Sequence, residues 1–176
     1  MNNFFGHLHT IGMHRRLVRK YCFRLGLYWQ GLTHDLSKYS PTEFVPGVKY
    51  YLGDHSPHLA ARKELGYSEA WMHHKGRNRH HFEYWTDYVG ENHAMVSVPM
   101  PPKYFAEMFC DRIAASRIYN KGHYEDYMPL DYFLKSKSHE SMNPKMSALL
   151  EKVLTIVKDQ GEDAGFDYVK KEVLGK

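Results

Sequence analysis

The sequence has little of what builds a disulfide framework, a membrane span or a repeat protein. Its two cysteines, Cys22 and Cys110, form no Cys-x-x-Cys pair, and each lies in an apolar, helix-like pattern. No stretch approaches the ~20 consecutive apolar residues of a transmembrane helix, and no internal repeat or low-complexity segment occurs. The N-terminus has no basic segment followed by an apolar run, so we expect no signal peptide. These absences predict a cytoplasmic protein that does not enter the membrane and keeps its cysteines reduced and buried.

The excess of positive over negative charge is also small, because 24 Lys and Arg residues and 20 Asp and Glu residues leave a net charge of +4. This mild surplus suits small anionic ligands and does not by itself indicate nucleic acid. A length of 176 residues predicts one domain, residues 1–176, with a substantial core. The unusual figures are 13 histidines and 14 tyrosines, and clustered histidines indicate metal or acid–base chemistry.

Two consecutive helices are predicted near the N-terminus, over residues 7–25 and 28–39, with a tight turn at Gly26. The first helix repeats apolar residues at helical spacing and places His14 on the same inward stripe. The second carries His34 and Asp35, which a helix presents about 100° apart. An isolated His-Asp pair is usually a local cap. If the pair is buried, however, an unpaired charge there is costly, and a bound metal ion would explain its presence.

A third helix is predicted to begin at Ser40, with Pro41 in its first turn, and to end near Gly53. Ser40 and Glu43 have the spacing of a capping box, in which each side chain satisfies a backbone N–H group at the start of the helix. Glu43 therefore has two open roles, as a capping residue or as part of a site.

The region between positions 73 and 93 holds five histidines. A short helix before Gly66 and a second one capped by Ser68 are predicted here, and the second places His74 on the stripe of Trp71. The pair His80-His81 follows in an aromatic run. A solvated polar loop is one interpretation of this cluster; its aromatic density favours a site.

A further helix is predicted from Pro102 to Lys121, with Asp111 in an otherwise apolar stripe. A carboxylate in that position needs a partner or a metal ion. Beyond it, supporting helices are predicted within about residues 129–174, and these show no chemistry of their own.

The inward-facing residues of metal-binding type are His14, His34, Asp35, His74, His80, His81 and Asp111. Their order, together with His34-Asp35-Leu36-Ser37-Lys38, resembles the HD-domain superfamily of metal-dependent phosphohydrolases. Within it, Trp71-x-x-His74, the run from Asn78 to Trp85, and Glu107 with Asp111 are similar to the DUF5662 family of unknown function. The resemblance implies an all-α, HD-like helical bundle whose motif-bearing core spans about residues 7–121, with a metal site between core helices.

Two features depart from the superfamily pattern. His14 and His34 are closer in sequence than in most HD domains, so His9 is an alternative first ligand. The Gly-Tyr-Pro element of one cyclic-dinucleotide phosphodiesterase subtype is absent after the double histidine.

Imidazole and carboxylate ligands suit one or two Fe, Mn, Co, Ni or Zn ions. Asp35 has two oxygens and could bridge two ions, and metal-bound water could attack phosphorus. Lys38 is either a catalytic residue that holds a phosphate oxygen or a surface lysine near a helix end. Arg77, Arg79 and Lys103 are weaker candidates for recognising further phosphates.

Together with these residues, the resemblance implies a metal-dependent phosphohydrolase acting on a nucleotide or small phosphoester, with Asp35 and Lys38 as catalytic residues. One alternative is a di-iron oxygenase of the HD type, which the histidine-rich second group favours. Another is a non-catalytic helical protein that binds metal or nucleic acid, with a basic patch from Lys75 to His81. That alternative gives no account of Asp35 and Asp111 on apolar faces.

Overall fold

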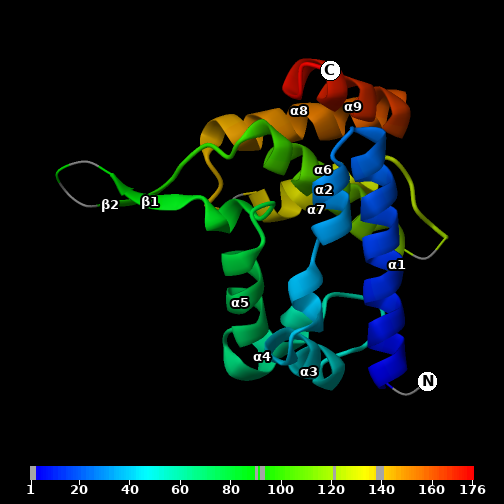
Figure 1. The fold of residues 1–176 in the computed structure, drawn as a ribbon, viewed down its shortest axis with the longest axis vertical. Helices are drawn as coiled ribbons and strands as arrows, with labels where there is room; N and C mark the ends of the chain where they lie inside the picture. Colours follow the sequence, from blue (N-terminus) through cyan, green and yellow to red (C-terminus); the bar gives the residue numbers. More distant parts are fainter. Residues whose placement is uncertain (1–2, 90, 92–93, 121, 138–140) are drawn as a thin grey trace.

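The computed structural model describes residues 3–89, 91, 94–120, 122–137 and 141–176, and most of this part of the chain is helical (Figure 1). The predicted all-α class is confirmed at the level of secondary structure. Two residues used in the sequence interpretation, His93 and Lys121, lie outside the described residues.

The centre of the fold is a pair of long helices, α1 (Asn3–Arg24) and α6 (Pro102–Tyr119), which pack against each other. Apolar residues at helical spacing form the contact, and Val18, Phe105 and Phe109 are completely or almost completely buried. After α1 the chain reverses at Gly26, whose φ of +69° favours glycine. The reversal brings α2 (Tyr28–Thr33) back along α1.

The segment predicted as one helix over residues 28–39 is broken, and the prediction was wrong. Helix α2 ends at Thr33, and a 3₁₀ turn, η1 (Leu36–Tyr39), follows. Between them, His34 has φ −48° and ψ 126°, and Asp35 is left-handed, with φ 54° and ψ 27°. An aspartate adopts this conformation more readily than most side chains do. The break therefore falls on the His-Asp pair itself.

Three short helices form one end of the molecule beside the N-terminal half of α1 (Figure 1). They are α3 (Pro41–Lys49), α4 (Pro57–Leu65) and α5 (Glu69–Arg77), which a 3₁₀ turn, η2 (Phe82–Tyr84), follows. Ser68 caps α5 as predicted, because its hydroxyl accepts a hydrogen bond from the Trp71 backbone N–H at 3.2 Å. The predicted capping box of α3 does not form, since Ser40 makes no capping bond and Glu43 is buried.

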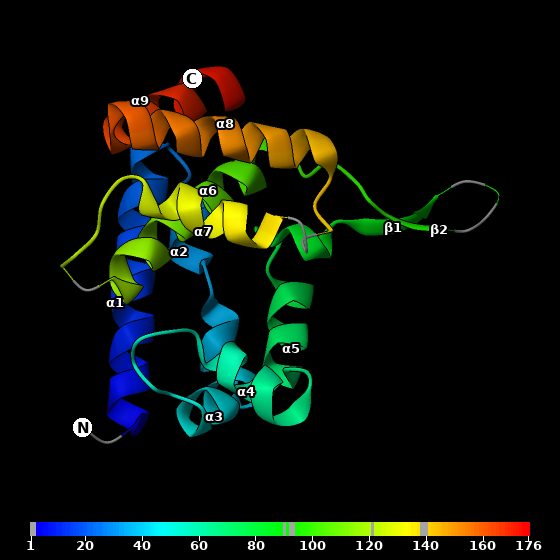
Figure 2. The ribbon, with the colours of Figure 1, turned by 180° about the vertical axis from the view of Figure 1, so that it is seen from behind.

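The C-terminal helices cover the opposite end of α1 and α6 (Figure 2). They are α7 (Met128–Lys137), α8 (Pro144–Gln160), α9 (Glu162–Tyr168) and a π-helical turn, η3 (Val169–Val173). Gly165 allows α8 and α9 to approach closely, because a Cβ atom there would overlap the Val157 side chain. This layer completes an apolar core with fully buried Phe133, Leu150 and Leu154. Cys22 and Cys110 are buried in it as free thiols, as predicted.

A β-hairpin that the sequence interpretation missed projects from the helical body (Figure 1). Its strands, β1 (Thr86–Val89) and β2 (Ala94–Ser97), pair antiparallel, with Tyr88 opposite Met95. Each strand has only four residues, so the alternation that marks a strand is too short to stand out beside strong helical patterns.

Candidate metal centre

The break between α2 and η1 delivers two adjacent side chains to the interior. His34 and Asp35 are each 1% exposed. Asp35 is the one non-glycine residue with positive φ in the part of the chain that the structure describes. In a continuous helix the two side chains would diverge, whereas the break lets both meet residues from α1, α5, α6 and the loop after α5.

The first group of residues, here called position A, consists of His14, His34, Asp111 and the Oδ2 atom of Asp35. His14 comes from α1 and Asp111 from α6. The Nε2 atom of His14 lies 2.9 Å from Oδ1 of Asp111 and 3.7 Å from Oδ2 of Asp35. The Nε2 atom of His34 lies 3.6 and 3.4 Å from the same two oxygens. Each residue thus offers one ligand atom, and all four lie within 4.8 Å of one another.

The second group, position B, consists of His74, His80, His81 and the Oδ1 atom of Asp35. His74 comes from the last turns of α5, and His80 and His81 follow that helix. The Nε2 atoms of His74 and His80 lie 3.3 and 3.4 Å from Oδ1 of Asp35. The rings of His80 and His81 are 4.2 Å apart, and the four ligand atoms again lie within 4.8 Å of one another. The two oxygens of Asp35 therefore face different groups, as in a bridging carboxylate.

Buried polar atoms without hydrogen-bond partners concentrate in these two positions. Buried polar atoms are nearly always hydrogen-bonded, so such a concentration needs an explanation. In the residues that the structure describes, the atoms of this kind at the two positions are Nε2 of His14, His34, His80 and His81 and Oδ1 of Asp35. All five are good ligands for a borderline divalent ion, so the residues present fit a metal.

Two buried glutamates hold the outer nitrogens of the histidines. Oε1 of Glu107 lies 2.9 Å from Nδ1 of His34 and 3.2 Å from Nδ1 of His80. Oε2 of Glu43 lies 2.7 Å from Nδ1 of His74. An Nδ1–H that donates to a carboxylate fixes the imidazole and leaves Nε2 as a ligand atom, which is the usual arrangement around metal-bound histidine.

The charges of the cluster perturb its acids and bases strongly. Burial raises the pKa of Asp35, but the charges of His34 and Lys38 outweigh it and hold that pKa well below the ordinary value. The pKa of Asp111 is also held well below the ordinary value, because the neighbouring His14 and His34 imidazoles outweigh burial. Burial lowers the pKa of His34, but Asp35 and Asp111 raise it well above the ordinary value. Both carboxylates are thus anionic at neutral pH.

The imidazole of His81 is held neutral. Burial is the largest cause that lowers its pKa well below the ordinary value, and the charges of His80 and His74 add to it. A neutral imidazole has a lone pair available for a metal ion. His81 also packs edge-on against Trp71, with the ring centroids 4.8 Å apart.

Lys38 lies at the edge of position A. Its Nζ atom is 2.6 Å from Oδ2 of Asp35, and its side chain is 26% exposed. Burial lowers the pKa of Lys38, but Asp35 and Asp111 outweigh it and raise that pKa above the ordinary value. The ammonium group is therefore charged and contacts the cluster, while part of the side chain is exposed.

The structure brings together all seven residues that the sequence indicated as ligands, namely His14, His34, Asp35, His74, His80, His81 and Asp111. His9, the alternative first ligand, is exposed on α1. The role of Glu107 was missed, although it precedes Asp111 by one helical turn and shares its inward face. Glu43 was assigned either to a cap or to the site, and it lies against His74.

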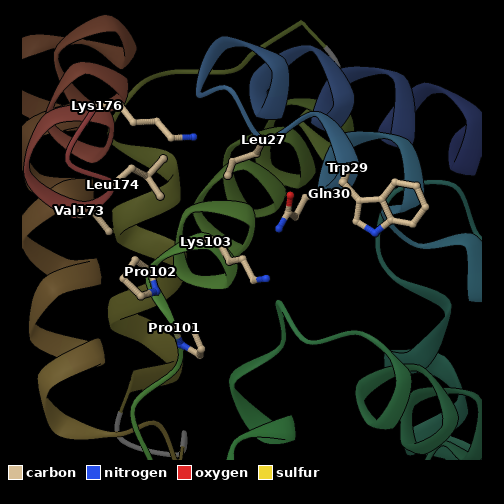
Figure 3. A pocket seen from close by; sticks show the side chains of 9 residues that line it. All are labelled: Leu27, Trp29, Gln30, Pro101, Pro102, Lys103, Val173, Leu174 and Lys176. Carbon is tan, nitrogen blue, oxygen red and sulfur yellow. The ribbon is translucent and has the colours of Figure 1, made fainter.

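The weaker phosphate-binding candidates do not join the cluster. Arg77, Arg79 and Lys103 are exposed, and Arg79 donates a hydrogen bond to the hydroxyl of Tyr104 at 3.3 Å. Lys103 instead points into a surface groove of about 590 Å³ between α2, α6 and the C-terminal turn (Figure 3). The groove is lined by Leu27, Trp29, Gln30, Pro101, Pro102, Lys103, Val173, Leu174 and Lys176. It contains none of the cluster residues.

The comparisons with known proteins identify one family. Among the described residues, every helix is too short or too polar to span a lipid bilayer. No curated protein and no solved structure matches the chain. A family model matches residues 3–156, which include every residue of positions A and B. The chain therefore belongs to the DUF5662 family, a family of unknown function.

Proposed function

We propose that this protein is a metal-dependent phosphohydrolase with an HD-domain-like bundle, acting on a nucleotide or another small phosphoester. The observation that carries the proposal is the placement of Asp35, which turns one oxygen toward each group of histidines. Two ions that share one carboxylate can act together on a single phosphoryl group.

The residues of positions A and B would hold Fe, Mn, Co, Ni or Zn, because imidazole-rich sites with few carboxylates suit borderline ions. When bound, such ions polarise a phosphoryl oxygen and lower the pKa of water toward neutrality. Asp35 and Asp111 supply the negative charge that offsets the ions. Glu43 and Glu107 keep the imidazoles in the orientation that metal binding requires.

We infer that a substrate reaches the cluster from the side of Lys38 and Asp111. Their side chains are 26% and 18% exposed, whereas those of His34 and His80 are 0% and 2% exposed. A phosphoryl group entering from this side meets the Lys38 ammonium first. Lys38 would hold a nonbridging oxygen and stabilise the charge that develops during attack on phosphorus.

The experiment that tests this function is metal reconstitution followed by an activity screen. The protein is stripped with a chelator, reloaded with each of the five metals, and assayed for phosphate release from a nucleotide panel and an aryl phosphate. We expect hydrolysis with at least one metal, and loss of at least ~100-fold in Lys38→Ala, because one charged group that stabilises a transition state is worth that much. Metal-loaded protein that releases no phosphate from any phosphoester would contradict the proposal.

A second candidate function, a di-iron oxygenase, is favoured by one observation. Position B offers three imidazoles beside the shared carboxylate, a ligand set suited to iron. Iron retained through aerobic purification, visible colour and consumption of O₂ with an added organic substrate would support this candidate. A colourless protein that hydrolyses phosphoesters equally well with Zn or Mn would contradict it.

A further inference from the structure

Arg15 follows the cluster residue His14 on α1 and reaches the break that carries Asp35. Its Nε–H donates to the backbone carbonyl of His34 at 2.8 Å, and an Nη2–H donates to the carbonyl of Leu32 at 3.2 Å. Carbonyls at the end of a helix have no partner within the helix, so these two bonds satisfy groups that α2 leaves open. Arg15 thereby ties α1 to the last residues before the left-handed turn.

The same guanidinium also holds the chain on the other side of the turn. An Nη1–H donates to the hydroxyl of Tyr39 at 3.4 Å, and the guanidinium carbon lies 5.2 Å from the centre of the Tyr39 ring. Tyr39 is the last residue of η1, four positions after Asp35. Arg15 therefore spans the whole turn, from Leu32 to Tyr39, without touching the metal-facing atoms of Asp35.

This turn needs such support because Asp35 is a non-glycine residue with positive φ. A left-handed conformation is unfavourable for a residue with a side chain, and it persists only where surrounding contacts determine it. The backbone supplies two hydrogen bonds around the turn. The N–H of Lys38 donates to the carbonyl of Asp35 at 3.1 Å, and the N–H of His34 donates to the carbonyl of Gln30 at 2.8 Å. Both bonds are local, whereas Arg15 connects the turn to another helix.

We infer that Arg15 is a positioning residue that fixes the left-handed turn so that both oxygens of Asp35 face separate metal positions. The inference rests on the proposed metal centre and adds the residue that aims its shared ligand. If the turn relaxed, Asp35 would still reach one group of histidines, but it would no longer reach both. Loss of Arg15 should therefore remove the paired arrangement before it removes metal binding altogether.

The test compares Arg15→Lys with Arg16→Lys in the full chain. Both variants keep the positive charge, and Arg16 is an exposed neighbour on the same helix. Lysine has a single ammonium group and cannot bridge two carbonyls and a tyrosine in the fork geometry of arginine. The probe is Mn²⁺, followed by calorimetric titration and by electron paramagnetic resonance, which reports the exchange coupling of a bridged pair.

We expect wild type and Arg16→Lys to bind two Mn²⁺ ions with a coupled spectrum. Arg15→Lys should bind the second ion at least ~10-fold more weakly and lose the coupled spectrum, while it retains the first ion. Equal stoichiometry, affinity and spectrum in Arg15→Lys and wild type would overturn the inference. If Arg15→Lys does not fold, Tyr39→Ala decides: weaker binding of the second ion supports the inference, and unchanged binding overturns it. Two coupled ions without phosphoester hydrolysis would contradict the proposed function but leave this inference standing.

Discussion

Position A is built on two long helices, whereas position B is built on the end of a short helix and the loop after it. The unshared residues of position A, apart from His34, come from α1 and α6, which also form the apolar core. Those of position B come from α5 and the residues after it, which lead into η2 and the hairpin. One position is therefore fixed by the core, and the other depends on hydrogen bonds from Glu43 and Glu107.

The two positions also differ in their ligand residues. Position A offers two imidazoles and two carboxylates, whereas position B offers three imidazoles and one carboxylate. Carboxylates balance the charge of an ion, while imidazoles favour borderline metals over Mg or Ca. The comparison teaches that Asp35 is the ligand residue that the two positions share.

The largest effect is expected from Asp35→Ala, which should remove both ions and any hydrolytic activity. Position B would then keep no carboxylate, and two ions would repel each other without a bridge. Alanine is also strained at positive φ, by about 1–2 kcal/mol. Asparagine tolerates that conformation, so Asp35→Asn separates the loss of charge from the loss of the turn. Metal content should be near zero in both variants, while circular dichroism stays helical; wild-type metal content in either variant would show that Asp35 is structural.

A smaller effect is expected from residues that belong to one position. Asp111→Asn should lose the ion at position A and keep the other, and His81→Ala should do the reverse. Each variant should therefore retain about one equivalent of metal, because each keeps all four ligand residues of the other position, including the shared Asp35. Loss of both equivalents from each variant would show that the two positions form a single unit.

The buried glutamates sharpen the comparison further. Glu43 supports His74 of position B only, whereas Glu107 supports His34 of position A and His80 of position B. Glu43→Gln should weaken one ion by about 10–100-fold, and Glu107→Gln should weaken both, because outer partners of metal-binding histidines have effects of that size.

Calorimetric titration of both glutamate variants measures these affinities. Glu64→Gln is the matched control, since Glu64 pairs with Lys49 at the surface. Equal affinities in Glu43→Gln, Glu107→Gln and the control would contradict the assigned roles.

The smallest expected effect is the pH dependence of metal affinity and of the stability of the metal-free protein. The pKa values of His34 and His74 are raised, because Asp35 outweighs the lowering by burial, so the metal-free protein binds protons there. Metal displaces these protons, and affinity should therefore rise with pH and vary with the ionisation enthalpy of the buffer. Without metal, the stabilisation from these histidines is fully present below about pH 6.5 and is lost as pH rises through their raised pKa values.

Thermal unfolding with and without metal over this pH range checks the sign. The stability of the metal-free protein should fall as pH increases above about 6.5, and bound metal should remove that fall. The lowered pKa of Asp35 affects the stability of the folded protein at acid pH. This stabilisation is present above about pH 3.9 and is lost as pH falls through the native pKa of Asp35. Metal affinity that does not change with pH would contradict the assignment of charged His34 and His74.

The sequence predicted the long helices of position A better than the local structure of the shared residue. Apolar spacing in α1 and α6 is long enough to fix the phase of His14 and Asp111. The break at His34 and Asp35 left no comparable signal, because the surrounding residues fit a helix and neither glycine nor proline marks the turn. Arg15 bonds the carbonyl of His34, next to the left-handed Asp35, but it lies 20 positions before Asp35, so no local pattern links the two residues.

Position B shows a different limit. The density of histidines and aromatic residues predicted a site there, but not which atoms face it. That depends on Glu43, whose spacing from Ser40 fits a helix cap equally well. Packing of α3 against α5 brings Glu43 to His74 and decides between the two roles.

The most direct test of the central claim is the metal content of the purified protein by elemental analysis, before and after incubation with Fe, Mn, Co, Ni or Zn and removal of the excess. Two ions bridged by Asp35 predict two equivalents of a transition metal per chain in the wild type, and none in Asp35→Ala. A wild-type protein that retains no metal under any of these conditions would contradict the account.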